Sequence, residues 1–317
     1  MPAQPIPLII DTDPGVDDAV ALVLALRSPE VDVRAVVAAF GNVGLERTLD
    51  NARRLVALAD RPDVPVAAGA ARPLVHDRPV RAAEVHGDDG LGGLAHTLPA
   101  PVPLDPRPGT DLMADVLRTA TAPVTIASIG PLTDTALLLA AHPELAERIG
   151  RIVIMGGSTG AGNITGAAEF NVFADPEAAH RVLTQAEVPV TLVPLDLTLR
   201  CAVDGQRLGR LAAGDAVCTQ LDALIEPYRD WYRGTHGMDG VPLHDSVALL
   251  EATVPGTLRA TPISLQVSCD LGPARGATVP DHGRTGGAQS PPVDVALDAD
   301  IPAVLDAVLT RLGAPAG

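Results

Sequence analysis

The sequence predicts an α/β protein built on an open, mainly parallel sheet flanked by helices, with some antiparallel strands late in the chain. Short apolar runs alternate with helical patterns along the sequence, which is typical of parallel strands joined by crossover helices. Hydrophobic residues make up 47% of the chain but aromatic residues only 2%, so the core must consist of Val, Leu, Ala and Ile. No linker divides the sequence, and we expect a single domain over residues 1–317.

The expected elements follow from apolar spacing. Strands are predicted at Ile6 to Ile10, Val31 to Phe40, Val64 to Ala67, Val124 to Ser128, Ile152 to Met155 and Val190 to Val193, and near 262–269, 275–280 and 292–297. Helices are predicted at Ala19 to Leu26, 45–59, 110–120, 204–213, 216–232, 246–253 and 301–312, with others opening at Gly130-Pro131 and Asp175-Pro176. Glycine and proline mark 237–243 as a loop, and 281–291 as a hairpin loop or an excursion between the last two strands.

Composition excludes several classes of function. The formal charge of −16 argues against nucleic acid and anionic membranes as partners, because phosphate binding needs clustered basic residues. All 23 basic residues are arginine, so neither Schiff-base chemistry nor the lysine of a Walker phosphate loop is available.

Cysteine usage and hydropathy predict the compartment. Cys201, Cys218 and Cys269 are odd in number, far apart and without a CxxC spacing, as in a reduced cytosolic chain. The first strand begins at about residue 6, without room for a signal segment, and no apolar run reaches the ~18 residues of a membrane span. We therefore expect a cytoplasmic protein with no membrane partner.

Four carboxylates lie within eight residues directly after the first strand, at Asp11, Asp13, Asp17 and Asp18. Pro14 and Gly15 predict a tight turn into a helix, whose dipole favours negative charge in its first turn. That accounts for two aspartates but not for four, since like charges about 4 Å apart repel by roughly 4 kcal/mol at an effective dielectric near 20. A hard divalent ion, Ca²⁺ or Mg²⁺, suits this acidic turn, and a solvated acidic cap is the alternative.

Polar motifs follow other predicted strands as well. Asn42, the turn at Ile129, the long glycine-rich connection from Gly156 to Ala174, and His244-Asp245 each follow a strand or open a helix. Ligands of an open α/β sheet bind at the carboxyl ends of its strands, and long connections in compact domains are usually functional. We expect five loops to converge on one pocket.

Six spaced motifs cover the chain from about residue 8 to about residue 311. They are Asp11-Thr12-Asp13-Pro14-Gly15-Val16-Asp17-Asp18-Ala19, Gly130-Pro131-Leu132-Thr133, Met155-Gly156-Gly157, Ala168-Glu169-Phe170-Asn171, Asp175-Pro176-Glu177-Ala178 and Leu243-His244-Asp245. In this order they resemble the motifs of the inosine-uridine preferring nucleoside hydrolases. The resemblance implies a Rossmann-like nucleoside hydrolase fold and an enzyme of purine and/or pyrimidine salvage, which cleaves the N-glycosidic bond of ribonucleosides with water.

The resemblance also implies one bound Ca²⁺ and a set of residues around it. The calcium ligands would be Asp13, Asp18, Asp245 and the backbone carbonyl of Ile129, and Asp13 would activate a calcium-bound water as general base. The ribose hydroxyls would be held by Asp17, Asn42, Asn163, Glu169, Asn171 and Asp245. Chemistry supports these roles, because riboside cleavage builds positive charge on the sugar that carboxylates stabilise.

On the base side, the resemblance places His86 and Met155 close to the nucleoside and makes His244 a candidate acid for the leaving base. Tyr228 and Tyr232 would close over the base, with core packing as the alternative for the aromatic group that they form with Trp231. A gap of one or two residues in the alignment would exchange Tyr228, Trp231, Tyr232 and His236 among these roles.

Other polar residues have plainer expectations. His142, His180, His236 and His282 are expected to be structural or on the surface. Asp134 departs from the family, in which asparagine commonly follows Gly-Pro-Leu-Thr; it could add negative charge near the site or cap the helix. The family usually forms homodimers or homotetramers, which is the expectation here too.

Two other classes of function remain open at this stage. Asp11 and Asp13 form an Asp-x-Asp after the first strand, as in haloacid-dehalogenase-like phosphohydrolases, but that chemistry normally needs a basic residue on the phosphate. A non-catalytic nucleoside-binding protein of the same fold is the other alternative. The joint presence of Asp13, Asp18, His244 and Asp245 argues against it.

Overall fold

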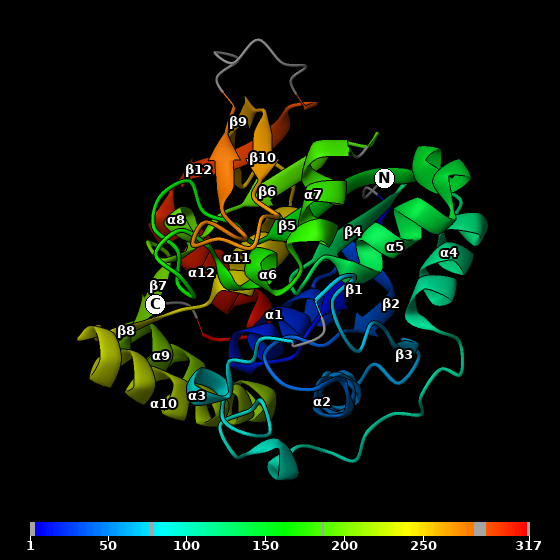
Figure 1. The fold of residues 1–317 in the computed structure, drawn as a ribbon. Coiled ribbons are helices and arrows are strands. Elements are labelled where there is room, and N and C mark those ends of the chain that lie inside the picture. The colour runs from blue at the N-terminus through cyan, green and yellow to red at the C-terminus, as the bar shows by residue number, and fades with distance from the viewer. Residues whose placement is uncertain (1–3, 77–78, 186, 282–289, 316–317) are drawn as a thin grey trace.

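The computed structural model describes residues 4–76, 79–185, 187–281 and 290–315, and an eight-stranded sheet forms its centre (Figure 1). The strands of this sheet are β1 (Ile6–Thr12), β2 (Val31–Ala38), β3 (Val66–Ala68), β4 (Val124–Ser128), β5 (Ile149–Met155), β6 (Val190–Val193), β9 (Leu258–Ile263) and β12 (Val293–Ala299). Their order is β3-β2-β1-β4-β5-β6-β12-β9, and every pair is parallel except β12 with β9. The predicted fold class, including its late antiparallel strand, is confirmed.

Helices cover both faces of this sheet. The first face carries α1 (Val16–Arg27), α2 (Leu45–Leu58), α9 (Gly205–Ala212), α10 (Ala216–His236), α11 (His244–Thr253) and α12 (Ile301–Leu312), and the second carries α4 (Gly109–Thr119), α5 (Thr133–Ala141) and α7 (Pro176–Gln185). Successive side chains of a strand point to opposite faces. Leu8 and Ile10 of β1 therefore join the core under α1 and α11, whereas Ile9 joins the core under α4 and α5.

Shorter elements lie in the connections. They are α3 (Ala83–His86), α6 (Phe170–Ala174), α8 (Leu195–Thr198), the 3₁₀ helices Ala95–Thr97 and Pro143–Arg148, and two antiparallel pairs, β7 (Ala202–Asp204) with β8 (Gly240–Pro242) and β10 (Leu265–Val267) with β11 (Thr278–Pro280). Sequence periodicity missed most of these because three to six residues are too few to establish a period.

The structure corrects several predicted boundaries. The third strand begins at Val66 rather than Val64, because the Val64 amide donates to the carbonyl of Arg61 and closes the turn after α2. The predicted strand at 262–269 is divided between β9 and β10, which belong to different sheets. The predicted loop at 237–243 contains β8. Most of the predicted 281–291 loop, residues 282–289, lies outside the described residues.

The carboxyl ends of the parallel strands lead directly into the polar motifs. Strand β1 runs into Asp13, β4 runs into Ile129 and β5 runs into Gly156. The turns therefore gather at one edge of the sheet, as expected. Among the described residues, no helix has the length and apolar character needed to cross a bilayer.

Candidate active site

A cavity of about 690 Å³ opens at the carboxyl ends of the strands. Thirteen of the predicted site residues line it, namely Asp13, Asp17, Asn42, His86, Ile129, Met155, Asn163, Glu169, Asn171, Tyr228, Tyr232, His244 and Asp245. The remaining predicted residue, Asp18, is buried and bonded to Thr12 and Asn42. The structure thus brings together residues that the sequence separates by more than 200 positions.

The acidic turn is shaped by Gly15, which precedes the first residue of α1. A Cβ atom at Gly15 would lie 2.7 Å from both the Asn42 amide nitrogen and His86 Nδ1, so only glycine allows the two side chains to approach the turn. Asp13 follows β1 and accepts a 2.7 Å hydrogen bond at Oδ2 from the Asn42 backbone N–H. Its other oxygen, Oδ1, is buried without a hydrogen-bond partner among the described residues. That free oxygen can accept a proton or bind a cation.

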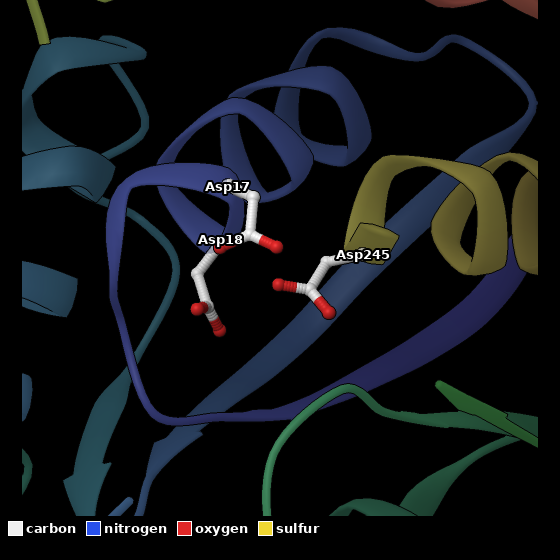
Figure 2. A group of neighbouring side chains, drawn as sticks. All are labelled: Asp17, Asp18 and Asp245. Atoms are coloured by element: carbon white, nitrogen blue, oxygen red, sulfur yellow. The ribbon is translucent and has the colours of Figure 1, made fainter. Parts of the chain in front are cut away.

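Asp18, unlike Asp13, accepts hydrogen bonds at both of its carboxylate oxygens. Oδ1 accepts a 2.6 Å bond from the Thr12 hydroxyl, and Oδ2 accepts bonds from the Gly15 N–H and the Asn42 side-chain amide at 2.9 and 3.1 Å. Asp17, Asp18 and Asp245 can present oxygens that all lie within 4.8 Å of one another. Figure 2 shows these three side chains, two from α1 and one from α11, turned toward the same space. The tight group therefore contains Asp17, whereas the resemblance assigned Asp13 to the metal and Asp17 to the sugar.

The electrostatics of this group favour a cation. Burial and then the charge of Asp18 raise the pKa of Asp17 to about 8. Burial and the charge of Asp18 also raise the pKa of Asp13 well above its usual range, and burial with the charge of Asp17 does the same to the pKa of Asp245. Burial raises the pKa of Asp18 as well. A positive charge among these carboxylates would offset both their desolvation and their mutual repulsion.

Asp11 and Asp134 lie behind this group. The Thr135 hydroxyl donates to Asp11 Oδ2 at 3.0 Å, which fits the expectation that Asp11 supports the turn. Asp134 accepts a 2.8 Å bond from the Ala70 N–H, and α5 begins after Leu132, so Asp134 does not cap that helix. Its charge, after burial, raises the pKa of Asp11, while burial raises the pKa of Asp134 itself to about 6.

The connection between β5 and α7 carries the polar residues expected to meet the sugar. Glu169 caps α6, accepting bonds from the N–H groups of Asn171 at 2.9 Å, Val172 at 3.2 Å and Gly157 at 2.7 Å. Burial nonetheless raises the pKa of Glu169 to about 7. Asn163 Oδ1 accepts a 2.9 Å bond from the backbone N–H of Phe170.

Asn171 points the other way, toward the strand ends. Its side-chain amide donates to the carbonyl of Ile129 at 3.0 Å and to the carbonyl of Met155 at 3.2 Å. The Ile129 carbonyl is the one expected to face a metal. It keeps a second lone pair for that purpose, because one carbonyl oxygen can accept two bonds.

His86, at the end of α3, approaches the acidic turn from outside the sheet. Its Nδ1 accepts a 3.1 Å bond from the Val16 N–H, and its ring stacks on Tyr228 with centroids 5.2 Å apart. Burial lowers the pKa of His86 to about 3. The ring is therefore neutral at pH 7 and carries its proton on Nε2, since Nδ1 is an acceptor.

Side chains on α10 and α11 form a connected chain. The Tyr232 hydroxyl lies 3.1 Å from His244 Nε2, and the Thr198 hydroxyl lies 2.7 Å from His244 Nδ1. The Tyr228 hydroxyl is 3.5 Å from that of Tyr232. Burial lowers the pKa of His244 to about 4, so this histidine is also neutral at pH 7.

Several cavity residues were not predicted for the site: Arg81, Glu84, Ile164, Phe170, Leu195, Leu199, Thr235 and Met238. Phe170 belongs to the Ala168-Glu169-Phe170-Asn171 motif but carried no predicted role, and the others belong to no motif, so no spacing rule points to them. Trp231 and His236 line the cavity too, with ring centroids 5.2 Å apart, and His236 is exposed as expected. Thr198 could have been found only from its contact with His244.

Comparisons with known proteins identify the class. The family model described as inosine-uridine preferring nucleoside hydrolase matches residues 8–306. The chain belongs to this family and is a ribonucleoside hydrolase, an enzyme that acts on N-glycosyl compounds.

Its relatives differ in the bases that their names specify. The chain is 41% identical over 311 residues to the pyrimidine-specific ribonucleoside hydrolase RihA of Salmonella agona, covering 97% of this chain and 98% of the relative. A plant nucleoside hydrolase, PpNRh1, matches with a TM-score of 0.91 and 33% identity, covering 98% and 100% of the two chains. A purine-preferring ribonucleoside hydrolase from Gardnerella vaginalis matches with a TM-score of 0.88 and 30% identity, covering 96% and 98%.

Proposed function

We propose that this enzyme hydrolyses the N-glycosidic bond of purine and/or pyrimidine ribonucleosides in a Ca²⁺-dependent reaction, with Asp13 as general base. The observation that carries this proposal is the buried, unbonded Asp13 Oδ1 in the wall of the cavity. The Asn42 N–H fixes the other oxygen, so Oδ1 has a defined direction in which to accept a proton from water. A positioned base of this kind contributes roughly 10²–10⁴-fold to a rate.

The donor set fits a calcium ion. We propose Asp13, Asp18, Asp245 and the Ile129 carbonyl as its ligands, an all-oxygen set of the kind that Ca²⁺ prefers. The raised pKa values of the three carboxylates support this, because burial and repulsion disfavour their charge unless a cation is near. When bound, such an ion lowers the pKa of nearby water.

We propose that the ribose lies against the acidic turn and the loop after β5. Asp17, Asn42, Asn163, Glu169, Asn171 and Asp245 would hold its hydroxyls. The side chains of Asn42, Asn163, Glu169 and Asn171 are fixed by bonds to the backbone before any sugar arrives, which reduces the cost of orienting the substrate. The negative charge of the three carboxylates would also stabilise the positive charge that develops on the sugar ring.

On the base side, we propose that His86, Met155, Tyr228 and Tyr232 surround the leaving base and that His244 is the candidate acid. Because His244 is neutral at pH 7, it would have to receive the proton that it passes to the base, and the Tyr232 hydroxyl, 3.1 Å from Nε2, is placed to supply one. The 41% identity to a pyrimidine-specific enzyme supports pyrimidine ribonucleosides among the substrates.

We also propose one domain over residues 1–317, a homodimer or homotetramer, and a cytoplasmic location in purine and/or pyrimidine salvage. The family resemblance supports the oligomer. Free cysteines at Cys201, Cys218 and Cys269 fit a reducing compartment.

Reducing-sugar release from a panel of ribonucleosides, before and after chelation, tests the proposed function. We expect release with Ca²⁺ and its loss on chelation, with recovery when Ca²⁺ is restored. Tight nucleoside binding without release would instead indicate a binding protein. Release of phosphate from an aryl phosphate, with no release of ribose from nucleosides, would indicate a phosphohydrolase.

A further inference from the structure

The start of the loop after β5 is held by a residue from a different sheet. Thr278, the first residue of β11, accepts a 2.9 Å bond at its hydroxyl oxygen from the Ser158 N–H and donates a 2.6 Å bond to the Ser158 carbonyl. One hydroxyl thus satisfies both backbone polar groups of a single residue. Ser158 and Thr278 are both buried, at 3% and 6% exposure, so water cannot readily replace these bonds.

The residue before Ser158 contacts the proposed sugar site directly. Gly157 donates its N–H to Glu169 Oε2 at 2.7 Å, and its carbonyl accepts a bond from the Leu195 N–H. Gly157 has φ +67, a left-handed conformation that favours glycine, and a Cβ atom there would lie 3.0 Å from Thr278. Gly157 joins the peptide that carries this N–H to the Gly157–Ser158 peptide, so the position of Ser158 constrains, through the Gly157 torsion angles, where the N–H points.

A second contact fixes the next residue from another side. Asp196, on α8, accepts bonds at Oδ2 from the Thr159 N–H at 2.7 Å and from the Ser158 hydroxyl at 3.1 Å. Asp196 binds the N–H of the Ser158–Thr159 peptide, whereas Thr278 binds the carbonyl of that peptide and also the N–H of the Gly157–Ser158 peptide, which Asp196 does not contact. The only side chain bonded to the backbone of Ser158, in the part of the chain that the structure describes, is Thr278.

We propose that Thr278 is a positioning residue for hydrolysis: by clamping Ser158 it directs the Gly157 N–H at Glu169 and so sets the Glu169 carboxylate for the ribose. This inference rests on the sugar-binding role proposed for Glu169. Thr278 itself does not line the cavity and touches no substrate. It acts through the hydroxyl, because the methyl group alone would keep the packing but leave both Ser158 groups unpaired.

Thr278→Val tests the two hydrogen bonds from Thr278 to Ser158, since valine keeps the shape of threonine and removes its hydroxyl. Thr278→Ser keeps the hydroxyl and is the rescue variant. Thr184→Val is the matched control, because Thr184 is also buried and its hydroxyl also bonds a backbone carbonyl, but that carbonyl belongs to His180 in the same helix, α7, and not to the loop after β5. Melting temperatures report any general loss of stability, and kcat and KM for a hydrolysed ribonucleoside report the site.

We expect Thr278→Val to lower kcat/KM by about 10–100-fold, the scale of a misplaced site group, with Thr278→Ser and Thr184→Val within about 3-fold of the parent. Combination with Glu169→Gln provides the second readout. If Thr278 acts through Glu169, the double variant loses little more than Glu169→Gln alone, whereas independent effects multiply.

Equal behaviour of Thr278→Val and Thr184→Val, or multiplied losses in the double variant, would overturn the inference. An unimpaired Glu169→Gln would remove the sugar role on which it depends. Each of these results differs from failure of the proposed function, in which the parent itself releases no ribose. If Thr278→Val does not fold, Thr278→Ala read against Thr184→Ala makes the same comparison.

Discussion

Two walls of the cavity are built in different ways. The acidic wall (Asp13, Asp17, Glu169 and Asp245, with Asp18 buried behind it) includes three carboxylates, those of Asp13, Asp18 and Glu169, that accept hydrogen bonds from backbone N–H groups. The aromatic wall (His86, Tyr228, Trp231, Tyr232 and His236) is held largely by contacts among side chains, with ring centroids 5.0 to 5.5 Å apart. The path of the chain therefore fixes the first wall, and the choice of side chains fixes the second.

This difference predicts which wall of the cavity varies more readily among relatives. A backbone donor remains in place whatever side chain its residue carries, so the backbone bonds to the acidic wall survive substitution of the donor residues. A contact between two hydroxyl or imidazole groups disappears with one substitution. Relatives whose names specify pyrimidine or purine share this fold, so base preference is expected to vary with the aromatic wall.

The largest expected effect is that of Asp13→Asn in the acidic wall. The amide removes the proton-accepting oxygen at the position of Oδ1 without changing the shape of the side chain, so we expect kcat to fall by about 10³-fold or more. Initial rates of reducing-sugar release measure the loss, and circular dichroism checks the fold. Unchanged turnover would show that Asp13 is not the base.

Asp134→Asn is the matched control for that experiment. Asp134 is equally buried, but it lies outside the cavity and bonds the Ala70 N–H. Its replacement removes the charge that raises the pKa of Asp11, so the variant should fold and keep a rate within about 3-fold of the parent. A loss as large as that of Asp13→Asn would mean that any buried charge in this region controls the rate.

The next effect concerns cation affinity. Ca²⁺ at about 100 times its Kd should stabilise the parent by roughly 2.7 kcal/mol, because it binds only the folded acidic wall. Asp245→Asn removes one proposed ligand and should shift the calcium dependence of the melting temperature to about 100-fold higher concentration. Asp175→Asn, also buried but outside the cavity, should titrate like the parent. If the melting temperature of the parent does not change with Ca²⁺ concentration, this result would contradict the proposed metal site.

The same contrast explains what could be predicted from the sequence. The acidic wall depends on local chain geometry, in which Pro14 and Gly15 force the turn and Asp17 and Asp18 enter the first turn of α1. These features are visible in eight consecutive residues. The parallel sheet and its order of strands and helices were predictable for a similar reason, because apolar periodicity is a local property of the chain.

The aromatic wall and the short strands were less predictable because they depend on tertiary contacts. His86 meets Tyr228 across 142 positions, and Thr198 reaches His244 across 46, with no motif to mark either pair. Strands β7 and β8 are three residues each and exist only because they pair with one another. Thr278 acts on the site through hydrogen bonds to the backbone N–H and carbonyl of Ser158. Other residue types carry the same backbone groups, so the sequence does not reveal this contact.

A smaller effect is expected in the aromatic wall from Tyr232→Phe. The variant keeps the ring and loses the hydroxyl 3.1 Å from His244, which should lower kcat by about 10-fold, the equivalent of one net hydrogen bond. Tyr228→Phe should cost less than about 3-fold, because its hydroxyl contacts are long, at 3.4 and 3.5 Å. Measured over several bases, a loss that varies with the base would support the leaving-group role. A loss equal for all bases, or larger for Tyr228→Phe, would contradict it.

The last expected effect is on stability rather than on rate, and it has opposite signs in the two walls. Burial lowers the pKa of His86 to about 3, while the unfolded chain keeps a value near 6.5. Between pH 6.5 and pH 3, His86 therefore binds a proton in the unfolded state but not in the folded state. The stability due to neutral His86 is fully present above pH 6.5 and is lost as pH falls toward 3. In metal-free protein, the raised carboxyl pKa values of the acidic wall have the opposite effect on stability, which they lower as pH rises.

His86→Asn isolates this histidine, because the asparagine Oδ1 occupies the position of Nδ1 and can still accept the Val16 N–H, but asparagine does not titrate. Between pH 7 and pH 5, the parent should lose about 2 kcal/mol more than the variant in its free energy of unfolding. Urea denaturation of calcium-free protein at the two pH values measures the difference. Parallel losses in the two proteins would show that His86 has the same pKa in the folded and unfolded states, and the aromatic wall would then gain a charge at pH 5 that its burial argues against.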